Sequence, residues 1–106
     1  MVSVQQIQYI VTVAEECQFQ RASERCFVTQ PTLSMQVKKA EETLGHLIFD
    51  RSRSPLALTN YGKTLLPILR DILSEYDKIG DLAKKRGRMG LAMALLRAKP
   101  GRLWNP

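Results

Sequence analysis

Residues 29–45 constrain the fold most, because both ends of one helix can be recognised there. Thr29 is a favourable N-cap, since its hydroxyl can accept a hydrogen bond from a free N–H of the first turn. Pro31 follows two residues later, and proline is tolerated in a first helical turn, where no intrahelical bond is lost. Gly45 can end the helix in a left-handed conformation. We therefore predict a helix over residues 30–44.

Two further helices are predicted before this one. Apolar residues recur at three- and four-residue spacing over 4–14, which is typical of one face of an amphipathic helix. A polar break at 16–18 separates this helix from a short second one over 19–26, in which Ala22 and Cys26 share a face. Since β-branched residues form helices poorly, tertiary packing must hold the first helix.

The chain changes character after the third predicted helix. Two short apolar runs, 47–49 and 56–58, flank a polar turn that carries Arg51 and Arg53, which indicates a small β-hairpin. Helix, polar link, capped helix and arginine-bearing hairpin together form the plan of a winged helix-turn-helix. We therefore predict a mainly α fold, with three helices and a small β-hairpin wing, as a DNA-binding domain over 1–58.

A long linker helix is predicted over 59–86, capped by Thr59 or Asn60. Its apolar residues step by 4, 3, 4, 3 and 4 positions, the spacing of a coiled-coil seam. Pro67 should kink the helix or confine the regular seam to later residues. The seam favours dimerisation over packing within one chain, because the small three-helix body offers so long a helix little to pack against. The predicted dimerisation residues are Leu65, Leu69, Ile72, Tyr76, Ile79 and Ala83.

The net charge of +6 does not by itself indicate nucleic-acid binding, because the charge is unevenly distributed. Residues 1–83 carry nine Lys and Arg against ten Asp and Glu, whereas 84–106 carry seven basic residues and no acid. The basic tail over 87–106 could be an additional phosphate-binding arm. It could equally be a non-native end, produced by truncation or a change of reading frame after the linker helix.

Leu33, Val37, Ala40 and Leu44 of the third predicted helix share one face, which we expect to be buried. The exposed face is small, hydroxylated and basic near its N-terminus, and its acids lie further along, at Glu41 and Glu42. A recognition helix enters the major groove with this end first, and its free N–H groups favour phosphate. The amide of Gln30 can recognise adenine, and Met35 can contact a thymine methyl. Lys38, Arg51 and Arg53 are candidates for phosphate contact, and Arg53 could also enter the minor groove. The predicted DNA-contacting residues are Thr29, Gln30, Pro31, Thr32, Ser34, Met35, Lys38, Arg51 and Arg53.

Six runs of residues, in order and at matching spacing, also carry a family resemblance. They are residues 8–16, 19–26, 28–34, 36–45, 47–51 and 58–62. Over 5–66 the chain thereby resembles the DNA-binding domain of LysR-type transcriptional regulators. The resemblance implies a bacterial regulator whose long helix dimerises and whose C-terminal effector-binding domain is absent. It also implies that residues 30–34 begin the recognition helix, that Lys38 is at a usual basic position, and that Arg51 and Arg53 belong to the wing.

Three departures from the family's pattern matter. The family often has arginine where this chain has Met35, which affects base preference. Gln18 is a poorer cap than the usual small polar residue before the second helix. The tail after about residue 87 does not resemble the first strand of an effector domain.

The cysteines and the single histidine do not indicate a redox or metal site. Tyr9, Cys26 and the run 31–34 resemble the peroxide-responsive, OxyR-like branch of the family, but that resemblance places the redox cysteines in the absent effector domain. Cys17 and Cys26 are therefore not their equivalents. His46 has no His, Cys or carboxylate partner at ligand spacing. We expect no cofactor and no metal.

The sequence thus predicts sequence-specific binding of double-stranded DNA by a homodimer, at an interrupted palindromic operator. One alternative is a coiled-coil interaction module that forms inactive heterodimers with full-length regulators, and another is a truncated fragment without function. No catalytic constellation is present, so we expect no enzyme. With no signal peptide or membrane-spanning run, we expect a cytoplasmic, nucleoid-associated bacterial protein without a membrane partner.

Overall fold

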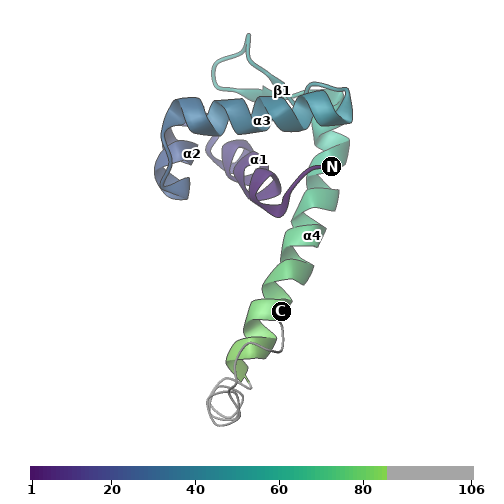
Figure 1. Cartoon of the computed structure of the whole chain (residues 1–106). Coiled ribbons are helices and arrows are strands. Elements are labelled where there is room, and N and C mark those ends of the chain that lie inside the picture. Colours follow the sequence, from purple (N-terminus) through teal and green to yellow (C-terminus); the bar gives the residue numbers. More distant parts are fainter. Residues whose placement is uncertain (86–106) are drawn as a thin grey trace. The chain divides into compact units, whose positions relative to one another are not determined.

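The computed structural model describes residues 1–85 of the 106-residue chain (Figure 1). The predicted basic tail over 87–106 lies outside the described residues. The chain divides into two compact units, residues 1–73 and 74–106. The described elements are α1 (Val4–Glu16), α2 (Phe19–Cys26), α3 (Gln30–Leu44), β1 (Phe49–Asp50), β2 (Ala57–Leu58) and α4 (Asn60–Lys85).

Side-chain caps set the ends of the helices. At α1, Ser3 and Gln6 each accept the other's backbone N–H through a side-chain oxygen, at 3.0 Å in both cases. Thr29 caps α3 and Thr59 caps α4, each through its hydroxyl. Gly45 ends α3 with a φ of 77°. These observations confirm the predicted bounds of α3 and identify Thr59, of the two candidates, as the cap of α4.

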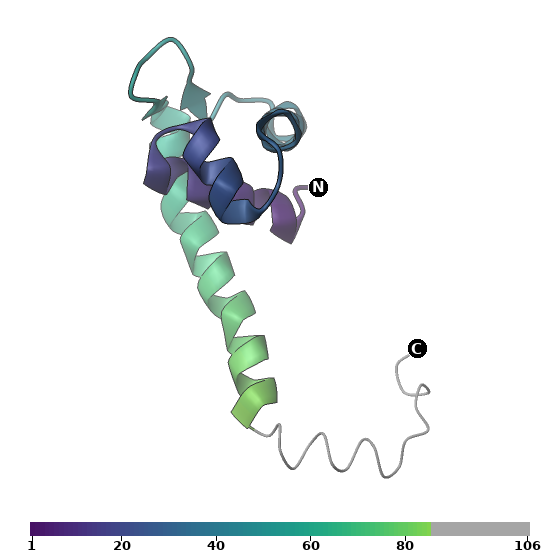
Figure 2. The same ribbon diagram turned by 90° about the vertical axis from the view of Figure 1, so that its left-hand side faces the viewer.

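The core of the first unit lies among α1, α2, α3 and the strand β1. The predicted inner face of α3 is confirmed, since Leu33, Val37 and Ala40 are completely buried. Figure 1 shows α3 lying across α1, and Figure 2 shows α3 nearly along its axis. The largest fully buried side chains are Phe49, Ile10, Leu33, Ile48, Val13 and Val37.

The predicted hairpin is present, with strands shorter than the two apolar runs. β1 and β2 pair antiparallel, Phe49 opposite Leu58 and Asp50 opposite Ala57. The intervening loop forms the tip seen above α3 in Figure 1. Three helices with this hairpin confirm the predicted winged arrangement.

The first turn of α4 packs closely against the chain that enters β1. The Thr59 N–H donates to the carbonyl of Ile48 at 2.9 Å, and its hydroxyl donates to the carbonyl of Leu47 at 2.6 Å. A Cβ on Gly62 would overlap the Ile48 carbonyl oxygen, so glycine is required at this contact. α4 continues through Pro67 without interruption.

Two residues of the predicted dimerisation seam lie in the core of their own chain. Leu69 is buried and Leu65 is half-buried, and both pack with the core of the first unit. Their spacing correctly identified the apolar face of α4, but periodicity cannot say whether the same chain or another covers that face. Within residues 1–85, no helix combines the length and the hydropathy needed to cross a membrane.

Candidate nucleic-acid interface

The first turns of α3 present a polar surface with one apolar side chain. Gln30, Pro31 and Lys38 are exposed, and Met35 is 49% exposed. Since Leu33 and its neighbours on the opposite face are buried, this side of the helix is free to meet a ligand.

Thr29 and Thr32, at the start of α3, differ in whether their hydroxyl groups can still donate a hydrogen bond. The Thr29 hydroxyl accepts the Thr32 N–H at 3.3 Å and donates to the Thr32 hydroxyl oxygen at 2.9 Å. The hydroxyl of Thr29 is therefore used within the cap. Thr32 keeps its own O–H as a donor. Thr32 and Ser34 are both half-buried. Of the two threonines, Thr32 is the better placed to donate to a phosphate or a base edge.

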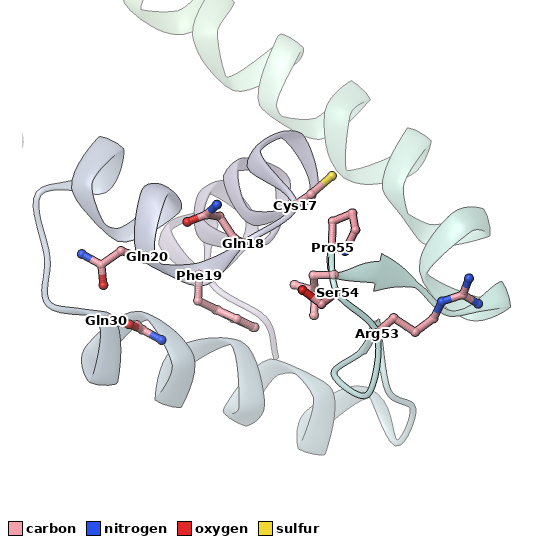
Figure 3. A pocket seen from close by; sticks show the side chains of 9 residues that line it. Cys17, Gln18, Phe19, Gln20, Gln30, Arg53, Ser54 and Pro55 are labelled. Carbon is pink, nitrogen blue, oxygen red and sulfur yellow. The ribbon is translucent and has the colours of Figure 1, made fainter.

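A hollow of about 440 Å³ lies between the starts of α2 and α3 and the hairpin loop. Figure 3 shows glutamines on the helical side of this hollow and Arg53, Ser54 and Pro55 on the hairpin side. Side-chain amide and guanidinium groups are among those that contact nucleic-acid phosphates and base edges. The lining residues are Cys17, Gln18, Phe19, Gln20, Gln30, Arg53, Ser54, Pro55 and Leu56.

The hollow adds two residues that the sequence interpretation missed as contact candidates, Gln18 and Gln20. Gln18 is the N-cap of α2 and makes no side-chain capping hydrogen bond, as its poor capping propensity predicts. Gln20 donates to the carboxylate of Glu24 at 3.1 Å. Their position at the start of α2 was visible in the sequence, but their approach to the hairpin loop was not.

The two wing arginines have different surroundings. Arg51 forms an ion pair with Glu41 at 3.1 Å, and its guanidinium lies 5.2 Å from the ring centroid of Phe19. The side chain of Arg51 is only 30% exposed. Arg53 is exposed, and within residues 1–85 it takes part in no ion pair. The structure thus places Arg53 as the freer cation of the predicted pair.

The sequence interpretation was wrong about Glu41, which it placed among the exposed acids of the third helix. Glu41 is 4% exposed and accepts the backbone N–H groups of Ile48 and Phe49 at 2.8 and 3.3 Å. These donors follow seven and eight residues later, so the spacing within the helix gave no sign of them. Glu42, its neighbour, is exposed as predicted.

Asp50 stabilises the turn that leads to Arg53. Its carboxylate accepts both the hydroxyl and the backbone N–H of Ser52. These two hydrogen bonds, with a smaller contribution from the positive charge of Arg53, hold the pKa of Asp50 below its ordinary value. At neutral pH Asp50 is therefore ionised, and its carboxylate can accept both hydrogen bonds.

The apolar face of α4 is exposed at several positions. In the first unit, Ile68 and Ile72 are 53% and 41% exposed. In the second unit, Tyr76, Ile79 and Leu82 are 47%, 67% and 56% exposed. Ile68 and Leu82 were not among the predicted dimerisation residues, because they lie beside the 4-3 spacing. Ala83, which was predicted, is exposed as well.

Four other side chains could suggest a further site. Phe27 is 93% exposed in the left-handed turn between α2 and α3, with a φ of 57°. The His46 ring stacks on Tyr61 with 4.2 Å between ring centroids, a partner that the sequence did not indicate. Cys17 is exposed and Cys26 is half-buried, and both are free thiols.

In the part of the chain that the structure describes, no three His, Cys, Asp or Glu residues form a group able to hold a metal.

Comparison with known proteins identifies the family. The family model described as "Bacterial regulatory helix-turn-helix protein, lysR family" matches residues 4–63. The DNA-binding transcriptional dual regulator OxyR of Escherichia coli (strain K12) is 33% identical over 85 residues, which are 80% of this chain and 28% of that protein. The regulator CfxR of Cupriavidus necator is 42% identical over 73 residues, or 69% of this chain and 23% of CfxR.

Solved structures give the same result. A full-length OxyR variant from Pseudomonas aeruginosa has a TM-score of 0.76 and 44% identity, over 80% of this chain and 29% of that chain. The BenM DNA-binding domain, solved with its benA site 1 DNA, has a TM-score of 0.75 and 28% identity, over 80% and 96% of the two chains. This chain spans less than a third of the curated relatives that it matches. The predicted resemblance is confirmed, and the chain belongs to the LysR family of bacterial regulatory helix-turn-helix proteins.

Proposed function

We propose that the chain binds double-stranded DNA as a transcriptional regulator, with the start of α3 in the major groove and the hairpin as a wing. The exposed N-terminal face of α3 carries this proposal, because its amide, hydroxyl and ammonium groups can all meet base edges and phosphates. The likeness to the BenM DNA-binding domain supports it, since that protein was solved on DNA and the match covers 96% of it.

The proposed contacts differ in kind along this face. Gln30, Thr32 and Met35 would contact base edges, while Lys38 and Arg53 would contact phosphates. Arg53 is also the side chain that would enter the minor groove beside the wing. Four further residues remain predicted contacts, Arg51 through the N–H groups that Glu41 leaves free: Thr29, Pro31, Ser34 and Arg51.

We also propose that two copies pair through the exposed apolar residues of α4, chiefly Ile72, Tyr76 and Ile79. Large apolar side chains at coiled-coil spacing gain about 1.5–3 kcal/mol each on full burial. A two-fold dimer would contact two half-sites, so the expected operator is an interrupted palindrome.

A second candidate function uses the same surface of α4. Through the exposed apolar residues of α4, the chain would pair with a full-length relative and form a heterodimer of reduced activity. This candidate and the homodimer differ in one measurable respect. The homodimer must recognise an operator by itself, whereas the heterodimer model requires only that α4 pair.

The proposed function is tested by selecting duplex DNA on the purified full chain and measuring affinity against salt concentration. Enrichment of an interrupted palindrome supports a dimeric DNA-binding regulator and provides its operator. Equal, salt-sensitive affinity for the selected and the scrambled duplex overturns the specific-binding proposal and favours the interaction module.

Phosphate contacts are tested with Lys38→Ala and Arg53→Ala. Each should reduce the slope of log affinity against log salt by about 0.9, the value for one phosphate contact. Lys63→Ala is the matched control, because Lys63 is an exposed lysine outside the proposed face. An unchanged slope for both variants would show that this face does not meet the DNA backbone.

A further inference from the structure

The carboxylate of Glu41 joins α3 to the hairpin at a buried position. It accepts two backbone N–H groups from the start of β1, those of Ile48 and Phe49. The guanidinium of Arg51 completes its shell, with Nη1 lying 3.1 Å from one oxygen and 3.3 Å from the other. A buried charge is tolerated when it is both paired and hydrogen-bonded, and here both conditions are met. Glu41 thus holds the base of the wing on the recognition helix.

Arg51 extends the connection to the second helix. Its guanidinium lies over the ring of Phe19, the first residue of α2, with 5.2 Å to the centroid. That ring in turn meets Phe49 of β1 edge to face, with 6.0 Å between centroids. The pair of Glu41 and Arg51 therefore connects α2, α3 and the hairpin, the three elements that border the hollow.

The pair also separates the roles of the two wing arginines. The side chain of Arg51 is bonded to a carboxylate, whereas Arg53, two residues later, makes no ion pair within residues 1–85 and lines the hollow between α2, α3 and the hairpin loop. The backbone N–H of Arg53 donates to the carbonyl of Asp50. The main chain of Arg53, from which the side chain extends, therefore belongs to a turn whose base is held by Glu41.

We propose that Glu41 and Arg51 are positioning residues that fix the wing on α3, and that they act on DNA binding through Arg53. This inference rests on the proposed DNA-binding function. Arg51 then supports the wing instead of contacting a phosphate. Glu41, although it is an acid, then favours the binding of DNA. A through-space repulsion of DNA by Glu41 and a positioning role of Glu41 predict opposite changes in DNA affinity when this acid is removed.

Glu41→Gln is the first test, measured on the duplex selected by the wild-type chain. If the charge acted only through space, removing an acid beside DNA would strengthen binding. Positioning predicts a loss of about tenfold, together with a salt slope lower by about 0.9, because the phosphate contact of Arg53 is misplaced. A variant that is merely less stable would show a lower active fraction and an unchanged salt slope. Glu42→Gln is the control, since Glu42 is the exposed acid next in the same helix.

Arg51→Lys is the second test, and it needs no change in charge. A lysine can replace an arginine at a simple phosphate contact, but it has no planar group that could lie over the ring of Phe19 while pairing with Glu41. Arg51→Lys should therefore weaken specific binding about as much as Arg51→Ala. A lysine variant with wild-type affinity would overturn the positioning role. These two variants decide the question if Glu41→Gln does not fold.

The double variant Glu41→Gln/Arg53→Ala tests the route through Arg53. If Glu41 acts by placing Arg53, then Glu41→Gln should have little further effect once Arg53 is alanine, so the two losses should not add. Fully additive losses would refute the coupling. Failure of the wild-type chain to select any duplex would instead refute the proposed function. The two failures are therefore distinguishable.

Discussion

α1 and α4 carry the same kind of apolar spacing, yet the structure buries one face and exposes much of the other. In α1, Ile10 and Val13 are completely buried by the rest of the first unit. In α4, Ile72 and Ile79 are 41% and 67% exposed. Periodicity therefore identifies which face of a helix is apolar, whereas the surroundings determine what covers it. For α4 we propose that a second chain provides the cover, since large exposed apolar side chains at coiled-coil spacing are typical of a helix-pairing face.

The largest expected effect comes from removing a side chain of the buried face. Ile10→Ala should lower the free energy of unfolding by about 2–5 kcal/mol, because it deletes methyl groups inside a packed core and leaves a cavity. Urea unfolding of a dilute sample measures this change. The matched variant in α4, Ile79→Ala, should change the value by less than about 0.5 kcal/mol under the same conditions. Equal losses for the two variants would mean that α4 is covered within its own chain.

The next effect concerns dimerisation. Ile72→Asp/Ile79→Asp should raise the dimer Kd roughly 100-fold or more, because two lost side chains remove about 3 kcal/mol of burial and 1.4 kcal/mol is a factor of ten. Sedimentation equilibrium measures the Kd, and circular dichroism should still report a folded helical chain. Thr64→Asp/Ser74→Asp adds the same two charges at exposed polar positions and should leave the Kd unchanged. A doubly charged seam that still dimerises would refute the proposed interface.

Phe27 gives a smaller effect of the opposite sign. This side chain is 93% exposed and its backbone is left-handed, a conformation that disfavours every residue except glycine and, to a lesser degree, asparagine. Phe27→Asn should therefore raise the free energy of unfolding by about 1 kcal/mol, with no change in the dimer Kd. Thermal unfolding detects the gain. A loss of stability would show that Phe27, like the residues of α1, is needed by the folded chain.

The sequence predicted those features whose causes are local. Thr29 and Gly45 mark the two ends of α3, because a cap depends only on the residues of one helical turn. Leu33 and Val37 share the inner face of α3, because a helix has a fixed period. The polarity of the exposed face followed from the same period. This part of the candidate interface required no knowledge of what packs against α3.

The features that escaped prediction depend on contacts between distant residues. Glu41 is buried against partners that follow seven to ten residues later in the chain. The burial could not be predicted, because the sequence did not specify the path of the turn between them. Leu69 is covered by its own chain although its spacing is that of a seam. The left-handed turn at Phe27 was missed for a different reason, since neither glycine nor asparagine marks it. For Glu41 and Leu69 the sequence did not reveal which residues cover the side chain, whereas for Phe27 it did not reveal the backbone conformation.

The smallest expected effect tests how closely a second helix approaches α4. Gly80 lies inside α4, and a Cβ added there would meet nothing within 4 Å among the described residues. Gly80→Ala should therefore raise the free energy of unfolding of a dilute sample by about 0.5–1 kcal/mol, because glycine weakens a helix interior. At concentrations that favour the dimer, the same gain is expected if the partner helix meets α4 only along Ile72, Tyr76 and Ile79. If the gain in the free energy of unfolding disappears at those concentrations, the backbone of the partner helix lies against Gly80. The interface would then involve a different face of α4.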